Sequence, residues 1–241
     1  MPGQFISPEG DLELIFVDDY NLIDQYAATG SLWMFGKNTY GNLGDNSVAH
    51  KSSPVQTVSG GTNWKQVASS TYNTAAIKTN GELWLWGRNS YGQLGDNSRN
   101  DASSPVQTVS SGTNWKQVAF GRNHVGAVKT DGTLWMWGDN GGPAQTGNGR
   151  LGDNTNIDTS SPVQTVSGGT NWKLVYCGNY HTAALKNDGT LWLWGNGGYG
   201  QLGNNDSTGR SSPVQTVSSG TNWKQAVCGI DGVLAIREDY Y

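Results

Sequence analysis

Residues 103–138 read SSPVQTVSSGTNWKQVAFGRNHVGAVKTDGTLWMWG, and most of this stretch recurs along the chain. The block SSPVQTVS occurs four times, GTNWK follows each copy, and LWxWG or LWMFG also occurs four times. Corresponding tryptophans are 51 or 57 residues apart, and the additional residues fall in the glycine-rich stretch 141–150. A period of this length indicates a repeat architecture in which each unit is one supersecondary element.

Each period contains four short apolar segments that we expect to be strands. In the second unit they are residues 83–87, 105–109, 115–119 and 125–129. The last strand of a unit reaches the next LWxWG through Asn-Gly or Asp-Gly, at 80–81, 131–132 and 188–189. These pairs favour type I′ hairpins, in which both turn residues have positive φ.

The run LWLWG at 83–87 is apolar without alternation, which is typical of a strand packed on both faces. Sheets stacked between neighbouring sheets, as in the blades of a propeller, meet that condition. A β-solenoid is the alternative, but its coils usually have shorter periods with one repeating turn. We therefore expect an all-β fold of propeller-type blades, each a four-stranded antiparallel sheet, in four repeats of 51–57 residues that form an incomplete or four-to-five-bladed propeller.

The order G-x-L-W-x-W-G-x-N-x-x-G-Q-L-G, P-V, W-x-x-V-x-x-G-x-x-H-T-A-A-L resembles the regulator of chromosome condensation repeat. Residues 90–96 (SYGQLGD), 198–203 (GYGQLG) and 177–185 (CGNYHTAAL) carry the resemblance most clearly, and it extends over about residues 30–241. The resemblance implies a β-propeller, which in this family has seven blades. Seven repeats of about 51 residues need more than the 241 present, so we do not expect a closed seven-bladed monomer.

Residues 1–29 form an expected leader or half-repeat, and residues 30–241 form the repeat domain. Residues 13–33 align without a gap to residues 64–84, which would give two degenerate strands. The alternative is a separate helical or docking element over residues 12–26. We assign its apolar and aromatic residues to assembly or closure: Leu12, Leu14, Phe16, Tyr20, Leu22, Ile23 and Tyr26.

Composition excludes several classes of protein. Charged residues are 14% of the chain, the net charge is −4, and the chain has 35 Gly, 11 Trp and 10 Tyr. We expect a folded, turn-rich protein that does not bind nucleic acid, because no run of Lys or Arg is present. We expect no membrane insertion and no secretory signal, because the chain lacks a long apolar run and a basic start.

For the polar residues that recur in the repeats, we expect structural roles and not catalysis or metal binding. His124 and His181 are equivalent to Asn73, so we expect a hydrogen-bonding residue that orders a loop. Cys177 and Cys228 are also equivalent and are expected to be small buried thiols, although a disulfide between blades is the alternative.

The remaining candidates are the acidic loops and the tryptophans. Asp45, Asp96 and Asp153 lack calcium-loop spacing, which favours turn chemistry. The tryptophans at i and i+2 of LWxWG could form a sugar platform, but packing between blades accounts for four copies more simply. No phosphate-loop, zinc or catalytic-triad motif is present. We predict no enzyme, no cofactor and no metal.

The segments between Gly-Asp-Asn and Ser-Ser-Pro vary while the flanking motifs do not: SVAHK (47–51), SRNDA (98–102), TNIDT (155–159) and DSTGR (206–210). Equivalent loops should project on one side of the blades, where we expect partner contact. The alternative is neutral drift of loop sequences that are under no constraint. The predicted partner-binding residues are His50, Lys51, Arg99, Asn100, Asp101, Asn156, Ile157, Asp158, Thr208 and Arg210.

Near-identical repeats with a polar, weakly charged surface resemble repeat proteins of bacteriophage particles and bacterial surfaces. The expected function is a non-enzymatic structural or adhesion protein in a virion, as a capsid decoration or a tail- or fibre-associated protein. Its partners would be virion proteins, copies of itself, or a host-surface receptor or glycan. The alternatives are a bacterial recognition or inhibitor propeller, in the cytoplasm or at the cell surface, and, less favoured, the nucleotide-exchange activity of chromosomal family members.

Four repeats would leave exposed strand edges, which proteins cover or pair. Three arrangements would cover them: a tight four-bladed ring, an arc completed by the N-terminal half-repeat, or several chains that share a ring or stack. We expect assembly with other copies or with a host particle.

Overall fold

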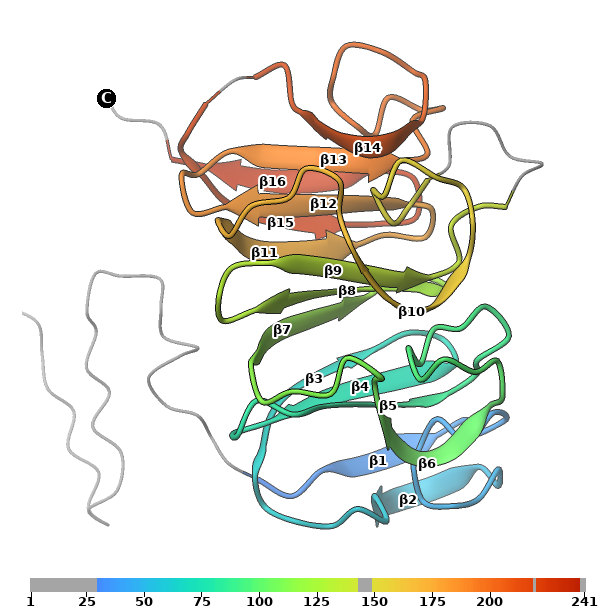
Figure 1. The fold of residues 1–241 in the computed structure, drawn as a ribbon. Coiled ribbons are helices and arrows are strands. Elements are labelled where there is room, and N and C mark those ends of the chain that lie inside the picture. The colour runs from blue at the N-terminus through green and yellow to red at the C-terminus, as the bar shows by residue number, and fades with distance from the viewer. Residues whose placement is uncertain (1–29, 143–148, 219, 239–241) are drawn as a thin grey trace, which may run out of the picture.

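The computed structural model describes residues 30–142, 149–218 and 220–238, and every element named in these ranges is a β-strand (Figure 1). The strands form five antiparallel sheets. Their bounds are β1 Trp33–Gly36, β2 Lys51–Gln56, β3 Trp64–Ser69, β4 Asn73–Lys78, β5 Leu83–Gly87, β6 Ala102–Gln107, β7 Trp115–Phe120, β8 His124–Lys129, β9 Leu134–Gly138, β10 Thr159–Gln164, β11 Trp172–Cys177, β12 His181–Lys186, β13 Leu191–Gly195, β14 Arg210–Gln215, β15 Trp223–Cys228 and β16 Val233–Arg237.

Three sheets are complete blades of four strands, with the orders β3-β4-β5-β6, β7-β8-β9-β10 and β11-β12-β13-β14. The pairs β1-β2 and β15-β16 are two-stranded half-blades. The predicted all-β fold of four-stranded antiparallel blades is therefore confirmed. Each complete sheet begins at GTNWK, so that the described part of the chain holds three whole blades and two halves rather than four whole blades.

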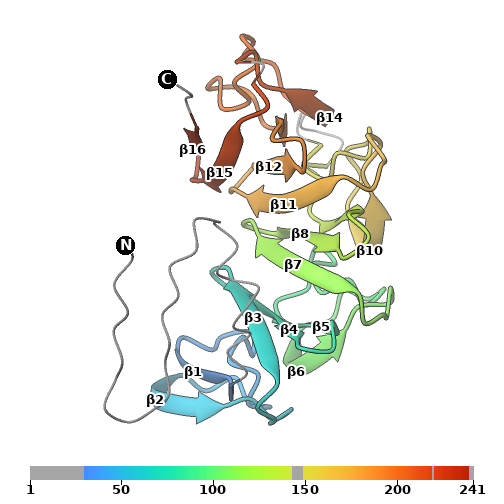
Figure 2. The same cartoon turned by 90° about the vertical axis from the view of Figure 1, so that its left-hand side faces the viewer.

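The blades follow one another along an arc (Figure 2). β1-β2 and β15-β16 stand at its two ends, and β6, β10 and β14 lie on its convex side. The first strands of successive blades are neighbours on the inner side. There the amide of Gln117 donates to the Val175 carbonyl over 2.9 Å, and its oxygen accepts from the Val175 N–H over 2.9 Å. Gln66 makes the same pair with Val118, at 3.2 Å for each bond. These two side chains join three blades along the inner edge.

The Asx-Gly hairpins differ from the predicted type I′ turns. Gly81 and Gly132 have φ of 83° and 79°, but the residue before each glycine does not have positive φ. Gly132 N–H donates to Lys129 O over 2.9 Å, and Lys129 N–H donates to Thr133 O over 3.0 Å. This is the longer hairpin loop in which a type I turn is followed by a left-handed glycine. In a type I turn Asp131 has negative φ, and its carboxylate accepts the Thr133 N–H over 2.9 Å.

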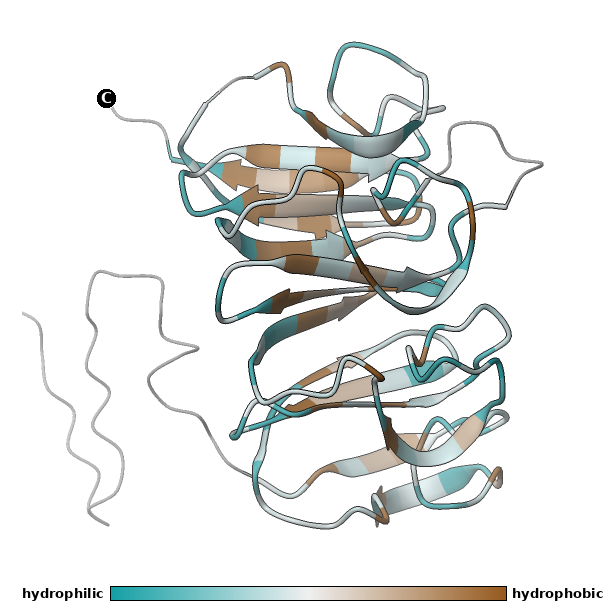
Figure 3. Ribbon diagram, viewed as in Figure 1, coloured by the Kyte–Doolittle hydropathy of each residue, from teal (hydrophilic) through white to brown (hydrophobic). Residues whose placement is uncertain are grey.

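The buried apolar clusters are shared between neighbouring blades. Figure 3 shows that the hydrophobic residues are concentrated in the strands. The second tryptophan of each complete LWxWG, at 86, 137 and 194, is fully buried, while the first is half-buried. The continuous apolar strand is thus covered on both faces over most of its length, as predicted. In each complete blade the GTNWK tryptophan lies beside the second tryptophan of LWxWG, for example Trp115 and Trp137 at 6.1 Å between ring centroids.

A lysine at the end of the second strand lies over two tryptophans in every complete blade. Lys129 is 4.7 Å from the Trp115 centroid and 4.6 Å from that of Trp135. Lys78 and Lys186 repeat this arrangement in the other two blades. The first tryptophan of LWxWG is therefore one wall of a cation–π sandwich and not an open sugar platform.

Candidate partner-binding face

The connections after the third strand of each blade and the short links between its first two strands lie on one face, because neighbouring strands are antiparallel. We call this face the loop face. It consists of residues 37–50, 88–101, 139–142, 149–158 and 196–209, with the short links 70–72, 121–123 and 178–180. In Figure 1 these long loops lie to the right of the strands, opposite the Asx-Gly turns. All four variable segments are on this face except for their last residues, which begin β2, β6, β10 and β14.

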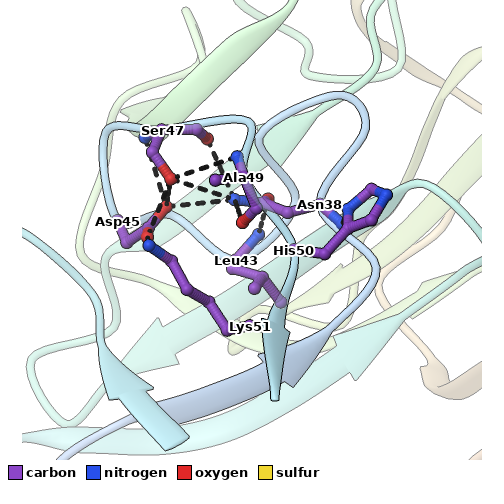
Figure 4. Close-up of polar contacts among 7 residues, drawn as sticks. All are labelled: Asn38, Leu43, Asp45, Ser47, Ala49, His50 and Lys51. Carbon is purple, nitrogen blue, oxygen red and sulfur yellow. Dashed lines mark hydrogen bonds and ion pairs between the residues drawn. The ribbon is translucent and has the colours of Figure 1, made fainter. Parts of the chain in front are cut away.

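A buried asparagine organises the first long loop (Figure 4). The Asn38 amide donates to Asp45 Oδ1 over 3.1 Å and to the carbonyls of Ser47 and Ala49 over 3.0 and 3.2 Å. Its side-chain oxygen accepts the Leu43 N–H over 2.8 Å. One fully buried side chain thus replaces regular secondary structure in holding the loop.

The next two repeats use the same residue in the same way. The Asn89 amide donates to Asp96 over 3.1 Å, and its oxygen accepts the Leu94 N–H over 2.9 Å. Asn140 does so with Asp153 over 3.1 Å and Leu151 over 2.9 Å. The fourth repeat has Gly197 at the equivalent position. The signal in the sequence is the asparagine two residues after LWxWG or LWMFG, which our sequence reasoning did not single out.

The loop aspartates serve these turns. Burial alone would raise the pKa of Asp45, but hydrogen bonds from Lys51, Ser47 and Asn38 outweigh it and hold the pKa below its ordinary value. Lys51 Nζ lies 3.0 Å from the Asp45 carboxylate. Within the described residues, no group of three or more His, Cys, Asp and Glu side chains could hold a metal ion.

Several predicted partner-binding residues make contacts inside their own loops. His50 accepts the Asn38 N–H through Nδ1 over 3.0 Å, and the equivalent Asp101 and Asp158 accept the N–H of the equivalent asparagines over 2.7 and 2.8 Å. Arg99 donates to the Ser90 carbonyl over 3.3 Å. Arg210 forms an ion pair with Asp206.

The remaining predicted residues differ in exposure. Ile157 is 71% exposed, Asn100 and Thr208 are exposed, and Asn156 is half-buried. Their role in binding a partner stays a prediction. The predicted assembly residues Leu12, Leu14, Phe16, Tyr20, Leu22, Ile23 and Tyr26 lie outside the described residues, as does the choice between strand and helix for residues 12–26.

A cluster of tyrosine and arginine side chains on the loop face was not predicted. Tyr40 and Tyr72 meet edge to face with centroids 4.9 Å apart. The Arg88 guanidinium lies 5.4, 5.9 and 5.7 Å from the ring centroids of Tyr40, Tyr72 and Tyr91. Lys37 lies 5.5 Å from the Tyr72 ring. We call these five residues the Tyr–Arg cluster.

A smaller set with the same chemistry lies further along the face. Arg150 and Arg122 lie 4.9 and 5.5 Å from the Tyr180 ring centroid. Arg150 also forms a buried ion pair with Asp139. Arg150 is the last residue of the lengthened stretch 141–150 and stands where the preceding repeat has Gln93, so this repeat places a charged side chain on the face.

The equivalent histidines are buried and have structural contacts. His124 Nε2 lies 3.0 Å from Thr182 Oγ1 in the next blade, and that hydroxyl donates to the Arg150 carbonyl over 2.9 Å. Burial, with the nearby Arg150 charge and His181, lowers the pKa of His124 to about 3. Asn73, the equivalent residue, bonds the carbonyl of Arg88 over 2.5 Å. The predicted hydrogen-bonding role holds for Asn73 and His124, and in His124 it joins two blades, whereas the buried ring nitrogens of His181 have no hydrogen-bond partner among the described residues.

Cys177 and Cys228 are both free and half-buried, without the disulfide considered as an alternative. Burial raises the pKa of both thiols, that of Cys228 to about 12. Neither thiol is therefore a thiolate near neutral pH.

The described residues also contain no helix of the length and apolarity that a bilayer crossing requires.

Comparison with known structures supports the propeller. Human WBSCR16 is 22% identical with a TM-score of 0.74, over 89% of this chain and 55% of that one. Prp20p from Saccharomyces cerevisiae, studied for its binding to Gsp1p and histones, is 18% identical with a TM-score of 0.70, over 87% of this chain and 52% of that one. A second match is yeast RCC1 (Prp20) bound to Kap60, with 17% identity and a TM-score of 0.66, over 81% of this chain and 46% of that one.

The similar curated proteins are longer. The ultraviolet-B receptor UVR8 of Arabidopsis thaliana is 32% identical over 188 residues, which are 76% of this chain and 41% of the receptor. The probable E3 ubiquitin-protein ligase HERC4 of Rattus norvegicus is 34% identical over 169 residues, which are 68% of this chain and 15% of the ligase. This chain therefore spans less than half the length of either relative.

The model of the regulator of chromosome condensation (RCC1) repeat matches residues 29–77, 80–128, 131–185 and 188–236. A second model of the same repeat matches residues 64–93 and 172–201. These matches cover most of the chain and have the same period as the blades, and so the chain belongs to the regulator of chromosome condensation repeat family.

Proposed function

We propose that this chain is a protein-binding scaffold that acts through its loop face and not through catalysis. The observation that carries the proposal is the Tyr–Arg cluster. Tyrosine and arginine are enriched at the centres of protein interfaces, where they contribute much of the binding energy. Here they are half-buried and stacked against one another before any partner binds.

Preorganisation favours binding because less side-chain entropy is lost when the complex forms. Arg88 is held over three rings, and its Nε donates to Ser90 Oγ over 3.1 Å. The surrounding long loops are fixed by Asn38 and Asn89. A partner would therefore meet a rigid surface whose rim varies between repeats.

Related propellers bind proteins. Prp20p of Saccharomyces cerevisiae binds Gsp1p and histones, and yeast RCC1 has been crystallised with Kap60. These partners belong to those proteins. For this chain, these examples support a partner that is a folded protein or peptide. They do not identify that partner.

The finer form of the proposal is a structural or adhesion role in a bacteriophage virion, with virion proteins or a host-surface receptor or glycan as partners. Its support is the near-identical repeats and the polar, weakly charged surface. The curated relatives named above come from a plant and a mammal and lend no support to this location. Mass spectrometry and immunogold microscopy of purified particles test it, and absence of the chain from the particles would contradict it.

Retention of partners from an extract of the source organism tests the loop face. The double variant Arg88→Ala/Tyr91→Ala should lose at least one protein that the unmodified chain retains. The matched control is Thr79→Ala/Thr130→Ala, which changes exposed residues at the Asx-Gly turns on the opposite face. If all three chains retain the same proteins in the same amounts, the Tyr–Arg cluster is not the binding surface.

A further inference from the structure

The two half-blades at the ends of the arc are complementary. β15-β16 corresponds to the first two strands of a blade, and β1-β2 corresponds to the last two. We propose that β16 of one copy of this chain pairs with β1 of a second copy, so that the two half-blades form one composite four-stranded blade. This inference is independent of the loop face and its partners.

The repeat fixes the register of the composite blade. In the first complete blade, Thr74 pairs with Trp86, Ala75 with Leu85, Ala76 with Trp84 and Ile77 with Leu83. The equivalent residues pair as follows: Val233 with Phe35, Leu234 with Met34, Ala235 with Trp33, and Ile236 with Leu32.

The residues that would pair expose apolar surface in the single chain. Phe35 is 67% exposed and Trp33 is 56% exposed, whereas Trp86, equivalent to Phe35, is fully buried. Ile236 is 60% exposed, whereas the equivalent Ile77 is fully buried. Contiguous exposed apolar surface along an unpaired strand edge marks an association site.

A groove of about 410 Å³ lies beside β16, on the side where the third strand of the composite blade would pack. Leu193, Gln201, Gly203 and Val233 are among its lining residues. In the preceding blades this space holds an indole: Trp137 donates to the Gln93 carbonyl over 2.9 Å, and Trp194 to the Arg150 carbonyl over 2.7 Å.

The glycines beside these indoles also show that this space is filled in the complete blades and open beside β16. A Cβ on Gly152 would lie 2.8 Å from the Trp194 Nε1 atom, so the indole fills that space. At the equivalent Gly203 the nearest atom is the Thr216 methyl carbon at 3.6 Å. The equivalent of the indole here is Phe35 of the second copy.

A second groove, of about 180 Å³, lies beside β1 and is lined by Leu32, Trp64 and Val67 among others. The corresponding Leu83, Trp115 and Val118 belong to one buried cluster with Ile77. Ile236 of the other copy is the equivalent of Ile77. Each end of the chain therefore carries a socket that matches an exposed side chain of the opposite end.

The cation–π sandwich gives a further match. Arg237 lies 5.7 Å from the Trp223 centroid, in the place of Lys78, Lys129 and Lys186. The second ring of each complete sandwich comes from the third strand. In the composite blade that ring is Trp33.

The curvature of the arc favours a second copy over closure within one chain. The half-blades stand at opposite ends of the arc (Figure 2). In the described part of one copy, β1-β2 and β15-β16 are separate sheets, so that β16 and β1 of the same copy do not pair. Head-to-tail joints between two copies close a ring where the rotation permits it, and otherwise give longer chains of copies.

A disulfide between two singly substituted chains tests the joint. Met34→Cys and Leu234→Cys would face each other in the composite blade. When the two differently tagged variants are mixed and mildly oxidised, we expect a covalent species of twice the 25.8 kDa chain mass that contains both tags. Each variant alone, which retains Cys177 and Cys228, is the control for background disulfides.

Two results would overturn the proposal. A third chain carries both Met34→Cys and Leu234→Cys. If a disulfide forms only within this chain, and not between the two single variants, the arc closes on itself. No disulfide in any combination would mean that another occupant covers the edges, for which residues 13–29 are the candidate.

Substitutions on both sides of the joint give a second measurement. The chain should scatter light as a species of two or more copies, and Phe35→Glu/Ile236→Glu should scatter as one copy with unchanged circular dichroism. Val109→Glu, at an exposed residue between β6 and β7 that belongs to neither half-blade, should leave the assembly intact. A single-copy mass for the unmodified chain would refute the joint.

Phe35→Trp should strengthen the joint, because its indole N–H can reach the Gln201 carbonyl as in the complete blades. One added hydrogen bond corresponds to roughly a two- to tenfold lower concentration at half-assembly. A weaker assembly of this variant would contradict the assignment of the groove to Phe35.

Discussion

At the scale of single residues, buried amides and imidazoles replace secondary structure where the strands end. The repeated Asn38, Asn89 and Asn140 bind main-chain atoms at several positions of their loops. A side chain that bonds mainly to main-chain atoms does not require particular residue types at its partner positions, so the surrounding sequence does not reveal these bonds. This explains why the pattern of strands could be predicted from the sequence and this loop support was not.

Asn89→Ala should lower the free energy of unfolding by roughly 1–3 kcal/mol, because it leaves the buried Leu94 N–H without its acceptor. Chemical denaturation measures the change. Asn100→Ala in the same loop is the control, since this side chain is exposed. Equal losses in the two variants would contradict a structural role for Asn89.

His124 makes stability depend on pH. Because burial lowers its folded-state pKa to about 3, the unfolded state binds more protons between about pH 3 and the unfolded pKa of about 6.5. Stability contributed by neutral His124 is therefore complete above about pH 6.5 and declines as the pH falls, by up to about 1.4 kcal/mol per unit. His124→Asn should reduce this dependence in denaturation midpoints measured at pH 7 and pH 5. An unchanged dependence would show that other groups cause it.

At the scale of elements, the Asx-Gly hairpins set the spacing between strands and also contact the next blade. The sequence predicted the hairpins correctly and their turn type wrongly. Asn-Gly and Asp-Gly favour type I′ only when the loop has two residues, and the length of the loop depends on the pairing of Lys129 with Thr133, which the dipeptide alone does not determine. The sequence also did not determine which strand begins each sheet, because a repeating pattern of four strands can be divided into blades at any of them.

Gly132→Ala should destabilise the protein more than a positive φ alone would. A Cβ there would lie 2.0 Å from the Thr170 carbonyl oxygen, at φ +79°. Gly142→Ala is the matched control, with φ +65° and no atom of the described residues within 4 Å of its Cβ. We expect the control to cost about 1–2 kcal/mol and Gly132→Ala clearly more, as measured by thermal or chemical unfolding. Equal costs would mean that the next blade does not press on the turn.

At the scale of the whole molecule, the blades are held along the inner edge by glutamines and at the loop face by histidine and tryptophan side chains. The sequence predicted stacked blades and exposed ends. The Tyr–Arg cluster could not be predicted, because its members come from two repeats and meet only when the arc has formed. The predicted virion location stays a hypothesis that only particles can test.

Gln117→Leu should weaken the contact between the second and third blades. Leucine already stands at the equivalent position 174, so the substitution copies a residue that this protein tolerates there. It removes both bonds to Val175 and should cost roughly 1–3 kcal/mol in the free energy of unfolding. Lys116→Leu, at the neighbouring half-buried residue, is the control, and a similar loss there would contradict the prediction.

The offset between sheets and sequence repeats has a consequence for how such a chain can change in length. A segment of 51 residues from one GTNWK to the next encodes one finished blade and its connection to the following one. Duplication or loss of that segment would alter the number of blades while β1-β2 and β15-β16 stay as they are. The angle spanned by the chain and the chemistry of its two ends can therefore evolve separately, and a gene of this kind can change the size of its assembly without redesigning the joint.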